Sequence, residues 1–260
     1  MLDKKQIAKT FGKKAAEYDT YARVQKYVGS TLLSKLSEHE VSIEGPILDL
    51  GTGSGYFLPE IKKQFPNDPL FALDLSEGMI KHASSKYSSL LAAAVVSDAE
   101  HLPFVDNSFA VIYSSMAIQW CEDIDGLLKE LCRVVKPGGL IAFSTLLPKT
   151  LHELKDAWQT IDQGAHVNRF LDSEVILDAM NQNANIEHFK CEFATAHYSD
   201  LKTLLHSIKG IGANTVVDGS KAMSKGQYKQ LIKAYDQCRS VSGQLPATYD
   251  VCYGILRVEK

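Results

Sequence analysis

The sequence lacks any apolar run of about 18 residues, the length that a membrane-spanning helix needs. The stretch from Met1 to Lys5 leads into a polar, amphipathic segment and not into the apolar core of a secretion signal. The five cysteines are scattered and form no CxxC pair, which argues against a disulfide framework or a zinc site. We therefore expect a cytoplasmic protein with reduced thiols and no bound metal, and with neither a membrane nor a nucleic acid as partner.

The sequence also has no internal repeat and no low-complexity tract. At 260 residues the chain is long enough for one large α/β domain with a modest cap, and too short for two full enzymes. The net charge of −3 hides a region rich in lysine, which is a candidate basic face, although an ordinary solvated surface is the default explanation. Its basic residues are Lys190, Lys202, Lys209, Lys221, Lys225, Lys229, Lys233 and Arg239.

Short apolar runs alternate with helical repeats through the first half of the chain, a pattern typical of βαβ units and a parallel sheet. A helix through residues 127–135 should stop at the segment 136–139, which reads Lys-Pro-Gly-Gly. The predicted fold is a Rossmann-like, doubly wound α/β domain with a mostly parallel, seven-stranded sheet. The strands expected in its first half are 46–50, 70–74, 92–96, 109–113 and 140–145.

Helical periodicity predicts helices over 4–17 and 22–37, before the first strand. Beyond Thr145 the alternation breaks, and Thr150 with Glu153 suggests a capping box that opens a helical insertion over the carboxyl edge of the sheet. Another helix should begin near Ser173. Later segments predict strands at 186–198 and 249–258, and helices at 200–209 and 224–240, the last opened by a Ser224–Gln227 capping box. We expect a single domain, 1–260, made of N-terminal helices over a cofactor (1–40), a cofactor-binding core (44–146), a helical insertion (147–183) and C-terminal strands and helices (184–260).

A glycine turn follows the first strand, where open parallel sheets bind their ligands. Gly51, Gly53 and Gly55 let the backbone pass close to a ligand and point a helix N-terminus toward it. Asp49 precedes them by two residues, and the GxGxG spacing differs from the GxGxxG of dinucleotide enzymes. Taken alone, this turn is a weak signal, since a tight turn without a ligand reads the same way.

Two further aspartates end neighbouring strands. Asp74 ends the second strand, where a carboxylate can accept hydrogen bonds from two ribose hydroxyls. Asp98 follows the third strand and is placed to accept a hydrogen bond from an adenine amino group. Aspartates in consecutive βα turns around a glycine loop predict a nucleoside-containing cofactor.

With these motifs in view, the segment 44–146 resembles class I S-adenosylmethionine-dependent methyltransferases. The resemblance rests on the glycine turn and on the segments 74–79 (DLSEGM), 98–104 (DAEHLPF) and 134–140 (VVKPGGL). It implies S-adenosyl-L-methionine as the cofactor. The cofactor-binding residues so expected are Tyr18, Asp49, Gly51, Thr52, Gly53, Gly55, Asp74, Leu75, Met79, Asp98, Ala99, Glu100 and Ser114.

Segments outside this core are similar to one family within that class, the malonyl-acyl-carrier-protein O-methyltransferases of biotin biosynthesis. They include the segments 11–18, 117–121, 144–146, 153–158, 166–171 and 205–213. The resemblance covers nearly the whole chain, but 216–225 and the last helix carry no family-specific pattern. It implies methylation of the free carboxylate of a malonyl thioester, on acyl carrier protein or on coenzyme A.

The expected reaction needs little from the protein in the way of a catalytic base, because a malonyl carboxylate is already ionised at neutral pH. Arg169 is predicted to hold that carboxylate, since its planar fork matches two oxygens, although a surface role competes with this. Tyr18 could close over the methionine end of the cofactor and so rank as catalytic, or be a core aromatic. Gln119 and Trp120 should line the substrate pocket near the transferred methyl, and His166 is expected to be a loop residue.

Three other functions remain open at this stage. The chain could methylate another small acid or metabolite. A nicotinamide-dependent oxidoreductase is disfavoured by the glycine spacing and by the lack of a Tyr-x-x-x-Lys pair. A non-catalytic binding subunit is disfavoured because every expected cofactor position holds a usable residue.

Overall fold

The computed structural model describes residues 3–212 and 223–259. The strands are β1 (Ile47–Leu50), β2 (Leu70–Asp74), β3 (Ala93–Val96), β4 (Phe109–Ser115), β5 (Val135–Leu146), β6 (Asn185–Tyr198) and β7 (Leu245–Arg257). The α-helices are α1 (Lys4–Lys14), α2 (Tyr18–Tyr21), α3 (Arg23–Leu36), α4 (Leu58–Gln64), α5 (Glu77–Tyr87), α6 (Ile124–Val134), α7 (His152–Gln159), α8 (Ser173–Asn183), α9 (Leu201–Gly210) and α10 (Lys225–Tyr235). Three 3-10 turns are η1 (Ser88–Leu90), η2 (Ile118–Trp120) and η3 (Asp236–Cys238).

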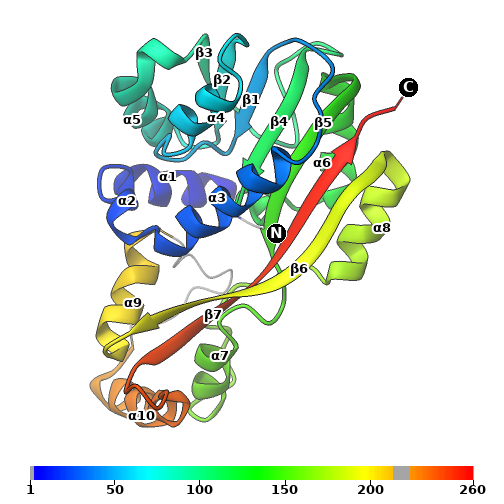
Figure 1. The fold of residues 1–260 in the computed structure, drawn as a ribbon. Helices are drawn as coiled ribbons and strands as arrows, with labels where there is room; N and C mark the ends of the chain where they lie inside the picture. Colours follow the sequence, from blue (N-terminus) through cyan, green and yellow to red (C-terminus); the bar gives the residue numbers. More distant parts are fainter. Residues whose placement is uncertain (1–2, 213–222, 260) are drawn as a thin grey trace.

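The strands form one seven-stranded sheet in the order β3-β2-β1-β4-β5-β7-β6. The pairings among β1 to β5 are parallel, and β7 runs antiparallel to both β5 and β6 (Figure 1). This confirms the predicted Rossmann-like, mostly parallel sheet. The order reverses between β1 and β4, which places the switch point of the sheet directly beside the glycine turn.

Helices cover both faces of the sheet, which explains why its central strands β1 and β4 are buried along nearly their whole length. β4 is buried along Phe109–Ser114, as expected for a parallel strand with helices on either side. Leu32 of α3 and Ile61 of α4 belong to the core on one face. Leu128 of α6 and Ile176 of α8 belong to the core on the other. Among the described helices, none is both long and apolar enough to cross a bilayer.

The last two strands, β6 with 14 residues and β7 with 13, are the longest of the sheet. β6 and β7 continue past its carboxyl edge and meet α7, α9 and α10, so that a second, smaller group of helices lies below the parallel part of the sheet (Figure 1). The predicted capping box that opens α10 is confirmed: Ser224 accepts from the backbone of Gln227, and the Gln227 side chain accepts from Ser224 N–H. These elements enclose the larger of the two cavities described below.

The helix α6 ends at Val134, which confirms the predicted stop before the Lys-Pro-Gly-Gly segment. The next strand is longer than predicted: β5 begins at Val135 and includes this segment, whereas the strand was expected over 140–145. The segment lies between two residues of β5 that pair with β4, Val135 opposite Phe109 and Leu140 opposite Val111, so it forms a bulge in the strand. Within this bulge Gly138 has φ 80°, a conformation that favours glycine.

The predicted Thr150–Glu153 capping box does not form. The residue before α7 is Leu151, in a left-handed conformation with φ 53°. Thr150 exchanges hydrogen bonds with the backbone of Asp250, and Glu153 accepts from Thr248, so both side chains tie α7 to β7. Helix α8 was expected over the carboxyl edge, but it packs on α6 and β6 at the face of the sheet. At Thr150 and Glu153, hydrogen bonds to β7 therefore replace the predicted local capping.

Candidate active site

A small cavity of about 110 Å³ lies at the carboxyl ends of β1, β2, β3 and β4. The parallel strands bring their C-terminal ends to one edge, so loops that are distant in sequence meet there. Many of the residues expected to bind a cofactor line it: Tyr18, Gly51, Gly53, Asp74, Leu75, Met79, Asp98, Ala99 and Ser114. The structure thus gathers the three βα turns around one space.

Asp74 is held in place by the backbone of its surroundings. Its Oδ2 accepts from Gly53 N–H at 2.9 Å and its Oδ1 from Ser76 N–H at 2.8 Å. Burial raises the pKa of Asp74, and these two backbone donors oppose the rise. An ionised carboxylate has about four acceptor positions, so room remains for two hydroxyl donors from a ligand.

Four of the expected cofactor residues do not line the cavity. Asp49 is 3% exposed and accepts from Thr52 Oγ1 at 2.6 Å, behind the glycine turn. Gly55 faces Leu58 and Tyr87, where a Cβ would collide with both side chains. Glu100 accepts hydrogen bonds from the backbone N–H groups of Glu122 and Asp123 and so holds the loop before α6. Asp49 lies in β1, where the alternation of side chains turns it away from the cavity, and the other three lie in the turns that follow β1 and β3.

Asp49→Asn should remove part of the pH dependence of stability. Burial raises the pKa of Asp49 to about 7, against about 3.9 in an unfolded chain. Between these values the folded protein binds more protons, so its free energy of unfolding falls as the pH rises toward 7. Urea unfolding of parent and variant should show the difference between them growing by roughly 2–4 kcal/mol from about pH 4 to about pH 8. Asp178→Asn, at an exposed position on α8, is the control; a pH-independent difference for Asp49 contradicts the prediction.

Helix α1 forms one wall of the small cavity through Lys4, Ile7, Ala8 and Phe11. The Lys4 ammonium lies 2.6 Å from Asp98 Oδ2 and also contacts Glu100. Helical periodicity predicts an amphipathic helix here with Ile7 on its buried face. It does not predict the ion pair between Lys4 and Asp98, which are 94 residues apart. Lys4 is therefore a site residue that only the tertiary structure reveals.

Two glycines let α1 approach the cavity closely. A Cβ on Gly78 of α5 would lie 2.7 Å from the Cα of Gly12, and a Cβ on Gly12 would lie 2.8 Å from Ser76 Oγ. Backbones without side chains at the crossing point can approach nearer than the usual distance between packed helices. Gly12 and Gly78 thus determine how far α1 covers the cavity.

Tyr18, Phe11, Met116 and Trp120 line both the small cavity and a much larger one beside it. The Phe11 ring meets the Trp120 ring edge to face, with 5.5 Å between centroids, and lies 6.4 Å from the Tyr18 ring. Met116 has a left-handed backbone, φ 51°, where β4 leads into η2. These residues form the junction through which the two cavities meet.

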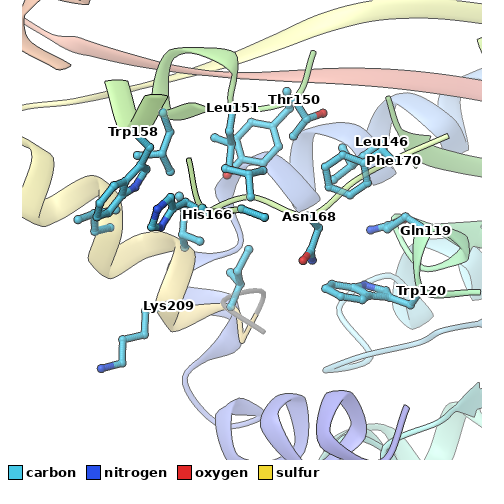
Figure 2. Close-up of a pocket in the computed structure, with 18 of the residues that line it drawn as sticks. Gln119, Trp120, Leu146, Thr150, Leu151, Trp158, His166, Asn168, Phe170 and Lys209 are labelled. Carbon is cyan, nitrogen blue, oxygen red and sulfur yellow. The ribbon is translucent and has the colours of Figure 1, made fainter. Parts of the chain in front are cut away.

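The larger cavity has a volume of about 1050 Å³ and lies between α7, α9 and the extended segment before α8 (Figure 2). Gln119 and Trp120 line it, as the sequence predicts for them in a substrate pocket, and so do Leu146, Leu151 and Phe170. Its lining is mainly apolar. Lys209 lies at the end of this cavity away from Trp120 (Figure 2).

The structure does not bring Arg169 into either cavity. Its side chain is exposed, whereas its neighbours Asn168 and Phe170 line the larger cavity. The consecutive residues 162–168 and then Phe170 line the larger cavity, and Arg169 between them is exposed to solvent. His166 stacks on Trp158 with 3.6 Å between ring centroids, consistent with the expected loop role. Asn168 lines the larger cavity, although no pattern in the sequence marks it as a site residue.

The chain matches the model of the methyltransferase domain over residues 48–143. Its fold is similar to YcgJ protein from Bacillus subtilis, with a TM-score of 0.60 and 17% identity, covering 88% of this chain and 99% of that one. It is also similar to geranyl diphosphate C-methyltransferase from Streptomyces coelicolor, solved with S-adenosyl-L-homocysteine, with a TM-score of 0.53, 16% identity and coverage of 88% and 80%. The glycine turn, the gathered aspartates and this fold define the class: a Rossmann-like methyltransferase.

Curated relatives narrow the class. The chain is 37% identical to malonyl-[acyl-carrier protein] O-methyltransferase from Serratia marcescens, covering 98% of this chain and 96% of that protein. It is 36% identical to the protein of the same name from Hahella chejuensis, covering 96% and 89%. The chain belongs to the malonyl-[acyl-carrier protein] O-methyltransferase family. It is also 38% identical to the biotin biosynthesis bifunctional protein BioHC of Teredinibacter turnerae, but spans only about half of that relative's length (47%).

Proposed function

We propose that this chain transfers a methyl group from S-adenosyl-L-methionine to the free carboxylate of a malonyl thioester on acyl carrier protein, a step of biotin synthesis. The observation that carries the proposal is the pair of adjoining cavities with a shared aromatic wall. One has the polar groups for a nucleoside, and the other is long and mainly apolar. The names of the family's curated members support the choice of substrate.

The residues of the small cavity suit the proposed cofactor. Asp74 would accept from ribose hydroxyls, Asp98 from the adenine amino group, and Gly53 leaves open space where a side chain would intrude. The cofactor supplies a methyl group on a positively charged sulfur. A volume of about 110 Å³ is below the roughly 300–1,000 Å³ of typical small-molecule sites, but the residues of the junction join this cavity to the larger one.

The acceptor needs no catalytic base. A malonyl carboxylate is ionised at neutral pH, since its pKa is about 4. Among the described residues that line both cavities, Tyr18 is the one that ionises, and burial together with Asp74 and Asp19 raises its pKa. Burial likewise raises the pKa of Cys121, in the small cavity, to about 12. Both side chains therefore stay neutral, and Tyr18 acts by packing at the junction.

The character of the larger cavity also favours the reaction. Attack of a carboxylate on a sulfonium methyl removes one negative and one positive charge, so a site with little water lowers the barrier. The apolar walls around the junction exclude water, and the pockets hold the reacting atoms in line. Positioning and desolvation would supply most of the rate enhancement.

The direct test is mass spectrometry of a malonylated acyl carrier protein after incubation with enzyme and S-adenosylmethionine. We expect one added methyl group on the acyl chain. An acetylated carrier protein is the matched control, because it has the same arm without the carboxylate. Methylation of free malonate but not of the carrier-bound acid would favour a small-acid methyltransferase instead. No methylation of the malonylated carrier would reject the proposal.

The basic residues of α9 and α10 should steer an acidic carrier protein to the larger cavity. Lys202, Lys209, Lys225 and Lys229 are exposed; Lys221 lies outside the described residues. Because steering by charge is screened by salt, kcat/KM for the carrier-bound substrate should fall as ionic strength rises. Lys209→Glu should blunt that fall. The control is Lys63→Glu, on α4 at the other end of the molecule (Figure 1). A salt-independent rate in the parent would leave these lysines as ordinary surface.

Arg169→Ala should leave the methylation of a small malonyl thioester within about twofold of the parent rate, because its side chain lies outside the cavity. A clamp on the substrate carboxylate would instead cost roughly 2–4 kcal/mol. The measurement is kcat/KM on the small thioester beside kcat/KM on the carrier-bound substrate. A loss confined to the carrier-bound substrate would place Arg169 in carrier docking, and a large loss on both would restore the clamp.

A further inference from the structure

Two carboxamide side chains in the larger cavity have acceptor oxygens that nothing in the described structure satisfies. Gln119 Oε1 and Asn168 Oδ1 are both buried and accept no hydrogen bond. Both residues line the cavity, and Figure 2 shows them on the same side of it, next to Trp120. Leaving a buried acceptor without a donor costs about 1–3 kcal/mol, so two of them in one cavity indicate a ligand that brings donors.

The orientation of Gln119 follows from its neighbour. Its Nε2 donates to Met116 O at 2.7 Å. The opposite orientation would set two carbonyl oxygens against each other, so Oε1 is the atom of this amide that has no partner. Gln119 therefore presents an acceptor close to Met116 and Trp120, two of the residues that line the junction between the cavities.

The reacting end of the proposed substrate cannot satisfy these acceptors. A malonyl carboxylate is ionised and offers no N–H or O–H, and an acceptor oxygen repels it. The thioester group beside it has no donor either. The missing donors must come from the next part of the substrate, beyond the sulfur. In acyl carrier protein and in coenzyme A, that part is a pantetheine arm, which carries a secondary amide N–H two methylenes from the sulfur.

We infer that Gln119 and Asn168 form a subsite that recognises the amide N–H of a pantetheine-type thioester, and so determine which malonyl esters enter the reaction. The inference rests on the proposed function and adds that the enzyme recognises the amide of the substrate's pantetheine arm. An amide held by these two oxygens places its thioester toward Met116 and Trp120 and directs the rest of the arm toward Lys209, at the other end of the cavity. Both residues are positioning residues, since neither acts on the transferred methyl.

The test compares two malonyl thioesters that differ in one group. One is the thioester of N-acetylcysteamine, and the other replaces its amide N–H by an ester oxygen, which has the same shape but no donor. The parent enzyme should prefer the amide by about 10-fold or more in kcat/KM, mainly through KM. Gln119→Met and Asn168→Leu, which keep side-chain volume, should each bring this ratio toward one by slowing the amide substrate alone.

Gln227→Met is the matched control. Gln227 lines the same cavity, but its Nε2 donates to Asp162 and its Oε1 accepts from Ser224 N–H, so the protein already uses its amide. Its replacement should leave the amide-to-ester ratio unchanged. A parent ratio near one, or a ratio that neither the Gln119 nor the Asn168 variant moves, overturns the inference and leaves water as the partner of these oxygens.

Binding separates this inference from the proposed function. Trp120 and Trp158 both line the cavity, so tryptophan fluorescence should report the affinity of each thioester without any methyl transfer. An enzyme that binds the amide more tightly but methylates neither thioester, nor the malonylated carrier, refutes the proposed reaction and keeps the subsite. An enzyme that binds and methylates both equally keeps the reaction and refutes the subsite.

Discussion

Asp74→Ala is expected to weaken the binding of S-adenosylmethionine by roughly 2–4 kcal/mol, which is about 30-fold to 1,000-fold in Kd. The side chain is a carboxylate that its own backbone neighbours hold toward the small cavity. Its loss removes a charged acceptor from two hydroxyls that then lie in a poorly hydrated space. Isothermal titration with S-adenosylmethionine measures the effect directly.

The variant should still fold, because Asp74 ends its strand at the sheet edge and takes no part in the apolar core. Thermal unfolding checks this. Asp178→Ala, an exposed position on α8, controls for the loss of one negative charge. Asp74→Asn should fall between parent and Ala, since it keeps an acceptor without the charge. An Ala variant with the parent's affinity would remove Asp74 from the cofactor site.

Gly51→Ala and Gly53→Ala should separate a structural glycine from a ligand-facing one. Both have positive φ, 73° and 54°. A Cβ on Gly51 would lie 2.3 Å from the Cβ of Ala117, whereas a Cβ on Gly53 meets nothing within 4 Å and faces the cavity. Gly51→Ala should destabilise the fold by roughly 2–5 kcal/mol, because overpacking adds to backbone strain. Gly53→Ala should cost only about 1–2 kcal/mol of stability.

Gly53→Ala should affect cofactor binding more than it affects stability. The added methyl group intrudes where the ligand passes the backbone, so we expect at least about a tenfold rise in Kd for S-adenosylmethionine. Urea unfolding gives the stability of each variant and isothermal titration gives its affinity. Parent-like cofactor binding by Gly53→Ala would show that the ligand does not approach this turn. A stable Gly51→Ala would show that the loop at Ala117 moves freely.

The sheet was predictable because its information is local. Each central strand is a short apolar run, each βα turn is marked by glycine or aspartate, and right-handed βαβ connections leave few other arrangements. The position of the glycine turn beside the switch point, and of Asp74 and Asp98 on the same edge, follows from the order of the strands. Local patterns predicted the wrong structure where a side chain forms a tertiary hydrogen bond instead of the local one. Thr150 and Glu153, for example, form hydrogen bonds to β7 instead of capping α7.

The sequence by itself therefore determined the class of fold, the edge where a cofactor would sit and most of the residues gathered there. Only the tertiary structure decided which side chains face the cavities. It turned Asn168 inward and Arg169 outward, in a segment without regular secondary structure where no periodicity predicts the direction of a side chain. It also brought Lys4 to Asp98, a contact between segments 94 residues apart. Neither outcome has a local pattern, since each depends on how separate elements pack against one another.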